Sequence, residues 1–238
     1  TTTTTNATLV YQRLEFARQC LWPGLDVHLI STTDGWAQFS VAGPNSRKLL
    51  KKVVDAKFDI SRSAFPFMAC AEVTICGGTP ARLFRISFSG ELAYEIAVPS
   101  RFGNAMIEVL MQAGKEYEAI PYGTEALGVM RIEKGHVAGN ELNGQTTALN
   151  LGLDSFVSNK KDFIGKTLSQ RHELKRDDAI RLVGFKPVDL SDSLVAGSHF
   201  INKGEVANIE NDQGWMSSVA YSPTLGHFIG LGFIKRGH

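Results

Sequence analysis

Apolar side chains recur at helical spacing in three long stretches of the chain. Residues 6–21 place one every three or four positions, with Asn6 as a candidate N-cap, until Trp22-Pro23-Gly24 ends the pattern. Residues 102–113 repeat the spacing of a helix that packs on one side, and residues 126–135 do so until Gly135. The pattern predicts three amphipathic helices, with a shorter helix over residues 46–54.

Runs of β-branched and apolar residues predict strands between and after these helices. Two of the runs flank Gly77-Gly78-Thr79-Pro80, and a Gly-Gly turn between such runs is typical of a hairpin. The order of the elements favours an α+β protein with antiparallel sheets. The predicted strands cover residues 26–31, 36–42, 72–76, 81–87, 94–98, 180–185, 215–221 and 228–234.

The character of the sequence changes near Asn150, where we place a domain boundary. A charged stretch at residues 160–178 follows it, and β-like runs dominate from there on. The five threonines at residues 1–5 suit either a polar tail or a strand, and we favour the strand. The chain starts without methionine and stops just after a strand-like run, so we expect truncation at both ends.

Charge and composition exclude several classes of partner. Lys and Arg total 25 against 24 Asp and Glu, so no net field attracts nucleic acid or an anionic membrane. No apolar run approaches the ~20 residues that cross a bilayer, and no leader is visible. We therefore expect no nucleic acid, no membrane and a cytoplasmic protein.

Neither the cysteines nor the histidines show metal-ligand spacing. Cys20, Cys70 and Cys76 are odd in number, which indicates reduced thiols, and we expect them to be buried core residues. The six histidines include no paired spacing of a zinc site, so no metal is expected. Gly230-Leu231-Gly232 follows no strand-to-helix pattern, so it does not predict a dinucleotide loop.

The segment 85–96 is the first candidate for chemistry. A polar turn at Gly90 links two strands, and Glu95 stands between the apolar residues Tyr94 and Ile96. A carboxylate is costly to bury without hydrogen-bond donors, so Glu95 is either a ligand residue or the polar position of a half-exposed strand.

The second candidate is the segment 131–147. Its polar residues and its glycines at positions 135, 139 and 144 suit an ordered loop beside a ligand. The alternative is a helix end with a solvated charged face.

Both segments resemble the aminomethyltransferase family, also called glycine-cleavage T-proteins. Ser89-Gly90-Glu91 with Tyr94-Glu95-Ile96 resembles the family's Tyr-Thr-Gly-Glu and Tyr/Phe-Glu signature. Matches in the same order follow at 131–133, 146–153, 161–166 and 218–226. Within the family, residues 84–95 and 128–141 are most similar to the alpha subunits of heterotetrameric sarcosine oxidases.

This resemblance implies a clover-leaf of mixed α/β lobes with folate in the central opening. Residues 1–31 would complete a lobe begun upstream. Residues 32–149 would form the central α+β lobe with the folate signature, and residues 150–238 an incomplete, β-rich C-terminal lobe.

The resemblance also assigns folate-binding residues. Glu95 would accept hydrogen bonds from the pterin's ring N–H and its exocyclic amino group, a charge-assisted fork. Phe88 replaces a family tyrosine and keeps its stacking surface, and His136 replaces another tyrosine as a polar wall. Leu127 stands where T-proteins carry an arginine. The family's acidic residue near the reactive nitrogens lies upstream of Thr1, so no catalytic residue is assigned here.

The function that the resemblance implies is to hold tetrahydrofolate while another subunit's flavin oxidises sarcosine. The chain alone would be inactive, since FAD, FMN and NAD of the complete enzyme would be bound outside it by a hetero-oligomer. The alternatives are a stand-alone aminomethyltransferase, a folate-dependent demethylase, or a non-catalytic structural module.

Overall fold

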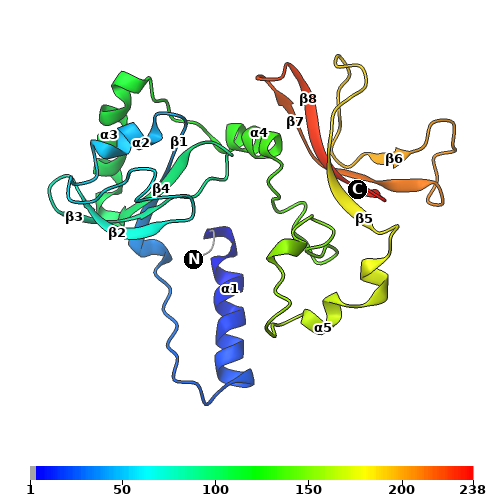
Figure 1. Ribbon diagram of the computed structural model, residues 1–238, viewed down its shortest axis with the longest axis horizontal. Helices are drawn as coiled ribbons and strands as arrows, with labels where there is room; N and C mark the ends of the chain where they lie inside the picture. The colour runs from blue at the N-terminus through cyan, green and yellow to red at the C-terminus, as the bar shows by residue number, and fades with distance from the viewer. Residues whose placement is uncertain (1–3, 238) are drawn as a thin grey trace. The chain divides into compact units, whose positions relative to one another are not determined.

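The computed structural model describes residues 4–237 and divides into two compact units. The first unit comprises Thr1–Ser87 with Glu91–Ile120, and the second comprises Phe88–Gly90 with Pro121–His238. Each unit is built around one antiparallel sheet of four strands (Figure 1). The prediction of an α+β fold with antiparallel sheets is confirmed.

The sheet of the first unit has the strand order β1-β4-β3-β2, so β4 lies between two neighbours. The strands run β1 Trp36–Ala42, β2 Cys70–Ile75, β3 Thr79–Phe84 and β4 Ala93–Pro99. The predicted hairpin is β2 and β3, joined at Gly77 and Gly78, whose φ angles of 84° and 129° suit glycine. Each prediction that placed a strand here is confirmed, with ends shifted by a few residues at most.

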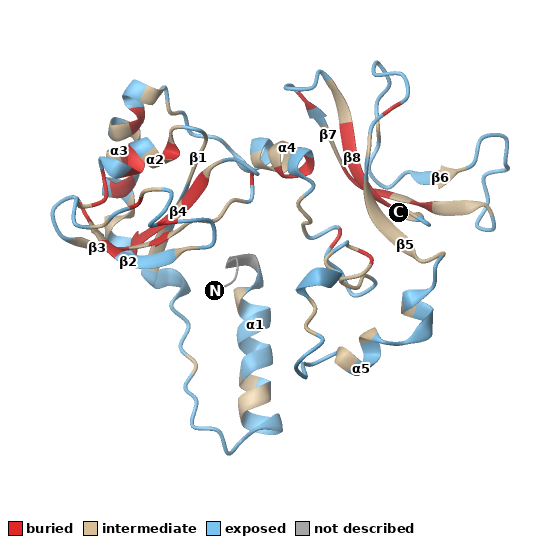
Figure 2. Ribbon diagram, viewed as in Figure 1, coloured by how far each residue is buried: buried red, intermediate tan, exposed pale blue. Residues whose placement is uncertain are grey.

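One face of this sheet is covered by helices α2 (Ser46–Lys51) and α3 (Gly103–Gly114). The helices follow from their apolar spacing, with Leu50, Met106 and Leu110 buried. Figure 2 shows buried segments on both helices. Strand β4 contributes Tyr94, Ile96 and Val98, each 0% exposed, to the same core. The full cluster of buried side chains is Leu49, Leu50, Val53, Val54, Ile60, Phe65, Val73, Ile75, Ala81, Leu83, Tyr94, Ile96, Val98, Met106 and Leu110.

The first helix, α1 (Thr4–Phe16), continues as a π-helical turn over Ala17–Leu21. The helix prediction is confirmed, but the N-cap prediction is wrong, because the helix already includes Thr4 and Thr5. The prediction of a strand over residues 1–5 is therefore wrong for Thr4 and Thr5. Residues 1–3 lie outside the described part of the chain. The strand predicted over residues 26–31 is also wrong: this segment has no sheet partner and its backbone is irregular.

The second unit pairs its strands in the order β5-β8-β7-β6. The strands run β5 Ile180–Phe185, β6 His199–Ile201, β7 Asp212–Ser222 and β8 His227–Lys235. Helix α4 (Thr124–Lys134) packs on this sheet, where Ile132 joins Ile229 and Leu231 in a small core. The β-rich C-terminal part is confirmed, while the three-residue strand β6 was missed because it is too short for an alternation pattern.

Asn150, the predicted domain boundary, is a buried hydrogen-bonding residue of the second unit. Its side-chain amide donates to the carbonyl of Ile180 at 2.8 Å, and its own carbonyl accepts the N–H of Leu182 at 2.7 Å. Both contacts tie the segment before the charged stretch to β5. The division into 1–31, 32–149 and 150–238 concerns the complete family fold and stays a prediction.

The three cysteines are free and exposed, so the prediction of buried core cysteines is wrong. Cys70 lies at the exposed start of β2, and Cys76 lies in the hairpin turn. Within residues 4–237, no helix is long and apolar enough to cross a membrane.

Gly214 on β7 provides a test of the packing of β7 against β8 in the sheet of the second unit. Its φ is 141°, and a Cβ added there would lie 1.9 Å from the backbone oxygen of Phe233. Because a backbone atom cannot move aside cheaply, Gly214→Ala is expected to destabilise the protein by about 3 kcal/mol. Urea unfolding followed by tryptophan fluorescence measures the change.

Gly184 on β5 is the matched control, since an added Cβ meets nothing within 4 Å there. Gly184→Ala is expected to change the free energy of unfolding by less than about 1 kcal/mol, in the stabilising direction. Similar losses for the two variants would contradict the close approach at Gly214.

Candidate functional site

Glu95 lies on the face of the first sheet that points away from the helices. In β4 it alternates with the core residues Tyr94 and Ile96, and it pairs with Ser40 on β1 and with Phe84 on β3. Its side chain is half-buried and accepts a hydrogen bond from the amide Nε2 of Gln38. The alternation that the sequence predicted is therefore present, but its polar face is partly covered instead of fully solvated.

The environment of Glu95 leaves room for further donors. Burial raises the pKa of its carboxyl group, and the hydrogen bond from Gln38 only partly opposes this. An ionised carboxylate offers about four lone-pair positions, so Gln38 satisfies one of them. Hydrogen-bond donors from a ligand would stabilise the charged form and lower this pKa.

A cavity of about 300 Å³ adjoins Gln38 on the same face of the sheet. Side chains of β1, β3 and β4 form one wall, and α1 with the segment after it forms the other. Its lining residues are Ala7, Val10, Tyr11, Leu14, Ile30, Ser31, Thr32, Thr33, Trp36, Gln38, Arg82, Phe84 and Ala97. The cavity is mostly apolar with a few polar groups, which is typical of a small-molecule site.

Phe88 and His136 lie together in the second unit, although 48 residues separate them in sequence. His136 Nδ1 donates to the carbonyl oxygen of Phe88 at 2.9 Å, and the two rings are 6.0 Å apart between centroids. Phe88 is 43% exposed, so its ring still offers an apolar face.

The three predicted site residues thus divide between the units. Phe88 and His136 are brought together in the second unit, and Glu95 belongs to the first. Their common role stays a prediction.

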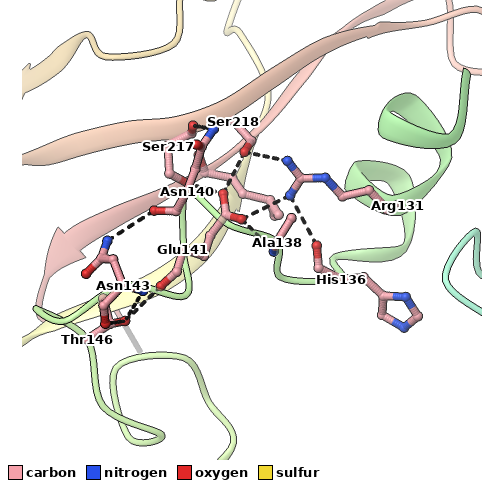
Figure 3. A network of polar contacts seen from close by, with 10 residues as sticks. Arg131, His136, Ala138, Asn140, Glu141, Asn143, Thr146, Ser217 and Ser218 are labelled. Atoms are coloured by element: carbon pink, nitrogen blue, oxygen red, sulfur yellow. Dashed lines mark hydrogen bonds and ion pairs between the residues drawn. The ribbon is translucent and has the colours of Figure 1, made fainter. Parts of the chain in front are cut away.

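Sequence reasoning missed a buried polar network centred on Glu141, which is 0% exposed (Figure 3). Arg131, in the last turn of α4, donates from Nη1 to Glu141 Oε2 at 3.1 Å and from Nη2 to Ser218 Oγ at 2.6 Å. The hydroxyls of Ser217 and Ser218 on β7 each donate to Glu141 Oε1 at 2.6 Å. The backbone N–H of Ala138 donates to Oε2 at 2.8 Å.

These contacts fix the segment 135–147 on the sheet of the second unit. Arg131 Nη1 also donates to the carbonyl of His136 at 3.2 Å, so the same cation holds the backbone beside the His136–Phe88 pair. Burial alone would raise the pKa of Glu141, but the hydrogen bonds from Ser217, Ser218 and Ala138 and the charge of Arg131 together lower it. Glu141 is therefore ionised and structural.

Within the segment 131–147, residues 131–134 form the last turn of α4, and residues 135–147 form an irregular stretch that hydrogen bonds hold in place. Arg131 and Glu141 are buried, whereas the charged residues Glu133 and Lys134 at the helix end are exposed. The segment therefore combines features of both interpretations, and a ligand beside it stays a prediction.

The sequence held one sign of the network centred on Glu141: Arg131 lies one helical turn after Leu127, on the side of α4 that packs on the sheet. Ser217 and Ser218 follow Glu141 by more than 70 residues, so no pattern in the sequence indicated that they are its partners.

Among residues 4–237, no group of three or more His, Cys, Asp and Glu side chains is arranged to hold a metal ion.

Comparison with known proteins places the chain in a family. The profile of the GCVT N-terminal domain matches residues 1–161. This chain is a member of the GCVT N-terminal domain family. A crystal structure of the glycine cleavage system aminomethyltransferase T from Bartonella henselae superposes with a TM-score of 0.77 at 22% identity, over 97% of this chain and 58% of that one. The predicted T-protein-like fold is confirmed.

Two relatives of this GCVT-family chain illustrate its similarities. The sarcosine oxidase subunit alpha of Rhizobium meliloti (strain 1021) is 50% identical over 239 residues, which is 100% of this chain and 24% of that protein. An aminomethyltransferase of Thermoanaerobacter sp. (strain X514) is 29% identical over 215 residues, 88% of this chain and 54% of that protein. The chain spans about a quarter of the length of the alpha-subunit relatives.

Glu141→Gln tests the buried network. The amide leaves the charge of Arg131 buried without compensation, so we expect a loss of about 3–5 kcal/mol of stability at neutral pH. The folded pKa of Glu141 lies below the unfolded one, so its contribution is present above the unfolded pKa and is lost as pH falls through the folded pKa. The variant should therefore show a shallower acid limb in urea unfolding measured across pH.

The control is Glu210→Gln, at an exposed carboxylate of the same unit. It is expected to change stability by less than about 0.5 kcal/mol at any of these pH values. An equal, small effect at both positions would show that Glu141 does not hold the loop.

Proposed function

We propose that this chain is the tetrahydrofolate-binding region of a sarcosine oxidase alpha subunit. It accepts the one-carbon unit from the oxidative demethylation of sarcosine, giving 5,10-methylenetetrahydrofolate. The similarity to a sarcosine oxidase subunit alpha covers the whole chain at 50% identity and supports this proposal. The structural observation that carries it is Glu95, a half-buried carboxylate that accepts a hydrogen bond from Gln38 beside a cavity.

The residues present fit such a ligand. The Glu95 carboxylate would accept hydrogen bonds from the pterin's ring N–H and its exocyclic amine, and these donors would stabilise its charged form against the effect of burial on its pKa. Phe88 would offer a flat apolar surface, and the ring of His136 beside it would form a polar wall. When bound, tetrahydrofolate supplies the nucleophilic nitrogens. The chain contributes orientation, so its effect on rate is one of proximity.

The flavin chemistry of the complete enzyme lies outside this chain in our proposal. FAD, FMN and NAD would be bound by the rest of a cytoplasmic hetero-oligomer together with its other subunits. About three quarters of the alpha-subunit relative lies outside the matched region, which leaves room for them. The chain alone would then bind tetrahydrofolate without oxidising sarcosine.

A stand-alone aminomethyltransferase is the second candidate, because such an enzyme is 29% identical over 88% of this chain. The higher identity to the alpha subunit favours the first candidate. A structural module without ligand is a third, and folate titration separates it from both.

Glu95→Gln tests the proposal, since the amide turns one acceptor into a donor that faces the pterin's own donor. Loss of a charge-assisted hydrogen bond should weaken tetrahydrofolate binding by roughly tenfold to a hundredfold. Isothermal titration calorimetry on the intact protein under anaerobic conditions measures the affinity.

The control variant is Glu91→Gln, an exposed carboxylate near the start of the same strand. Its tetrahydrofolate affinity is expected to match that of the parent protein. Because burial of Glu95 disfavours its charged form, Glu95→Gln should also leave folding stability unchanged or raised. Equal affinities for the two variants would return Glu95 to the role of a strand surface residue.

A further inference from the structure

The cavity of the first unit carries one cation on an aromatic platform. The guanidinium of Arg82 lies over the ring of Trp36, with its central carbon 4.0 Å from the ring centroid. Among the described residues that line the cavity, Arg82 is the charged one, and none is acidic. An anionic group that enters the cavity therefore meets a single positive charge.

The ion pair that Arg82 makes inside the protein is weak. Its Nε is 3.8 Å from the carboxylate of Glu72, whose side chain is 85% exposed. Exposed pairs at this distance contribute little because water and salt screen them. Stacking on Trp36 uses the face of the guanidinium and leaves N–H groups at its edges to donate.

Strand register places Arg82 and Glu95 on the same face. Arg82 pairs with Ala97, two residues beyond Glu95 on β4, and Trp36 pairs with Pro99. From Glu95 to Pro99 the strand advances four residues, about 13 Å at roughly 3.3 Å per residue. Glu95 therefore adjoins the cavity through its hydrogen-bond partner Gln38, and the cation over Trp36 lies in the cavity itself.

Apart from a few polar groups, the cavity is lined by apolar side chains. Phe84 and Ala97 form its floor on the sheet, and Val10 and Leu14 of α1 face it from the other side. A ligand that fits this order has hydrogen-bond donors at one end, a flat apolar middle and an anion at the other end. Tetrahydrofolate has this order: the pterin carries the donors, the benzoyl ring is flat, and the glutamyl group carries carboxylates.

We propose that Arg82 binds the glutamyl carboxylates of tetrahydrofolate, with the benzoyl group in the cavity between Glu95 and Trp36. The proposal rests on the proposed function, because it uses Glu95 as the contact of the pterin end. It makes Arg82 a specificity-determining residue, one that separates complete folates from pterins without a tail.

Two ligands and one substitution test the assignment. Arg82→Met keeps an unbranched side chain over Trp36 and removes the charge. We expect it to weaken tetrahydrofolate binding to the intact protein by roughly tenfold to a hundredfold, the value of a lost charge-assisted contact. Binding of 6-methyltetrahydropterin, which has no benzoylglutamate tail, should change by less than about twofold, since it loses no contact.

Arg101→Met is the matched control. The guanidinium of Arg101 also lies over an aromatic ring, that of Phe102 at 4.6 Å, but it does not line the cavity. This variant is expected to bind both ligands as the parent protein does. Arg82→Lys keeps the charge without the planar fork, so its tetrahydrofolate affinity should be partly restored. Circular dichroism checks that each variant is folded. If Arg82→Met does not fold, the tetrahydrofolate affinity of Arg82→Lys tests the role of Arg82 instead.

The outcomes are distinct. Equal losses for the two ligands in Arg82→Met, or no loss for tetrahydrofolate, would overturn the role of Arg82. Glu95→Gln should weaken both ligands alike, so a Glu95 variant that binds both normally would refute the proposed pterin contact while the Arg82 comparison stands. Failure of the parent protein to bind either ligand would refute the proposed function itself.

Discussion

The alternation of side chains along β4 is the constraint on which the candidate site depends. Tyr94, Ile96 and Val98 must enter the core beneath α2 and α3, because burial of these three side chains holds the sheet against its helices. Successive side chains of a strand point to opposite faces of the sheet, so Glu95 and Ala97 face away from the core helices. The position of a costly half-buried carboxylate is therefore a consequence of core packing.

The same alternation extends across the neighbouring strands. Trp36 and Gln38 on β1 and Arg82 and Phe84 on β3 share the face with Glu95, since directly paired residues point the same way. Four strands that bury one face thus present a second face with aromatic, cationic and acidic groups in a fixed order. A rigid sheet positions such groups more firmly than a loop does.

In the second unit, buried charged and polar groups attach the loop after α4 to the sheet. Glu141 and Arg131 are both buried, and each would be costly if it stood alone. The two hydroxyls of β7 and one backbone N–H complete the carboxylate's shell, so the loop after α4 is held on the sheet without a large apolar core. Ile132 of α4 joins Ile229 and Leu231 of β8 in a small apolar cluster, and the polar contacts add to this attachment.

The sequence by itself determined the elements whose signals are local. The helical period of residues 6–21, 102–113 and 126–135, the Gly-Gly hairpin and the strand alternation around Glu95 depend on near neighbours, and the structure shows each of them. The family signature also lies in short contiguous segments. Only the tertiary structure decided which polar residues turn inward: Glu141 finds its serines more than 70 residues away, the cysteines proved exposed, and residues 26–31 formed no strand for want of a partner. Hydrogen bonds and burial between distant segments settle these features, and a pattern read along the chain carries no record of who the partner is.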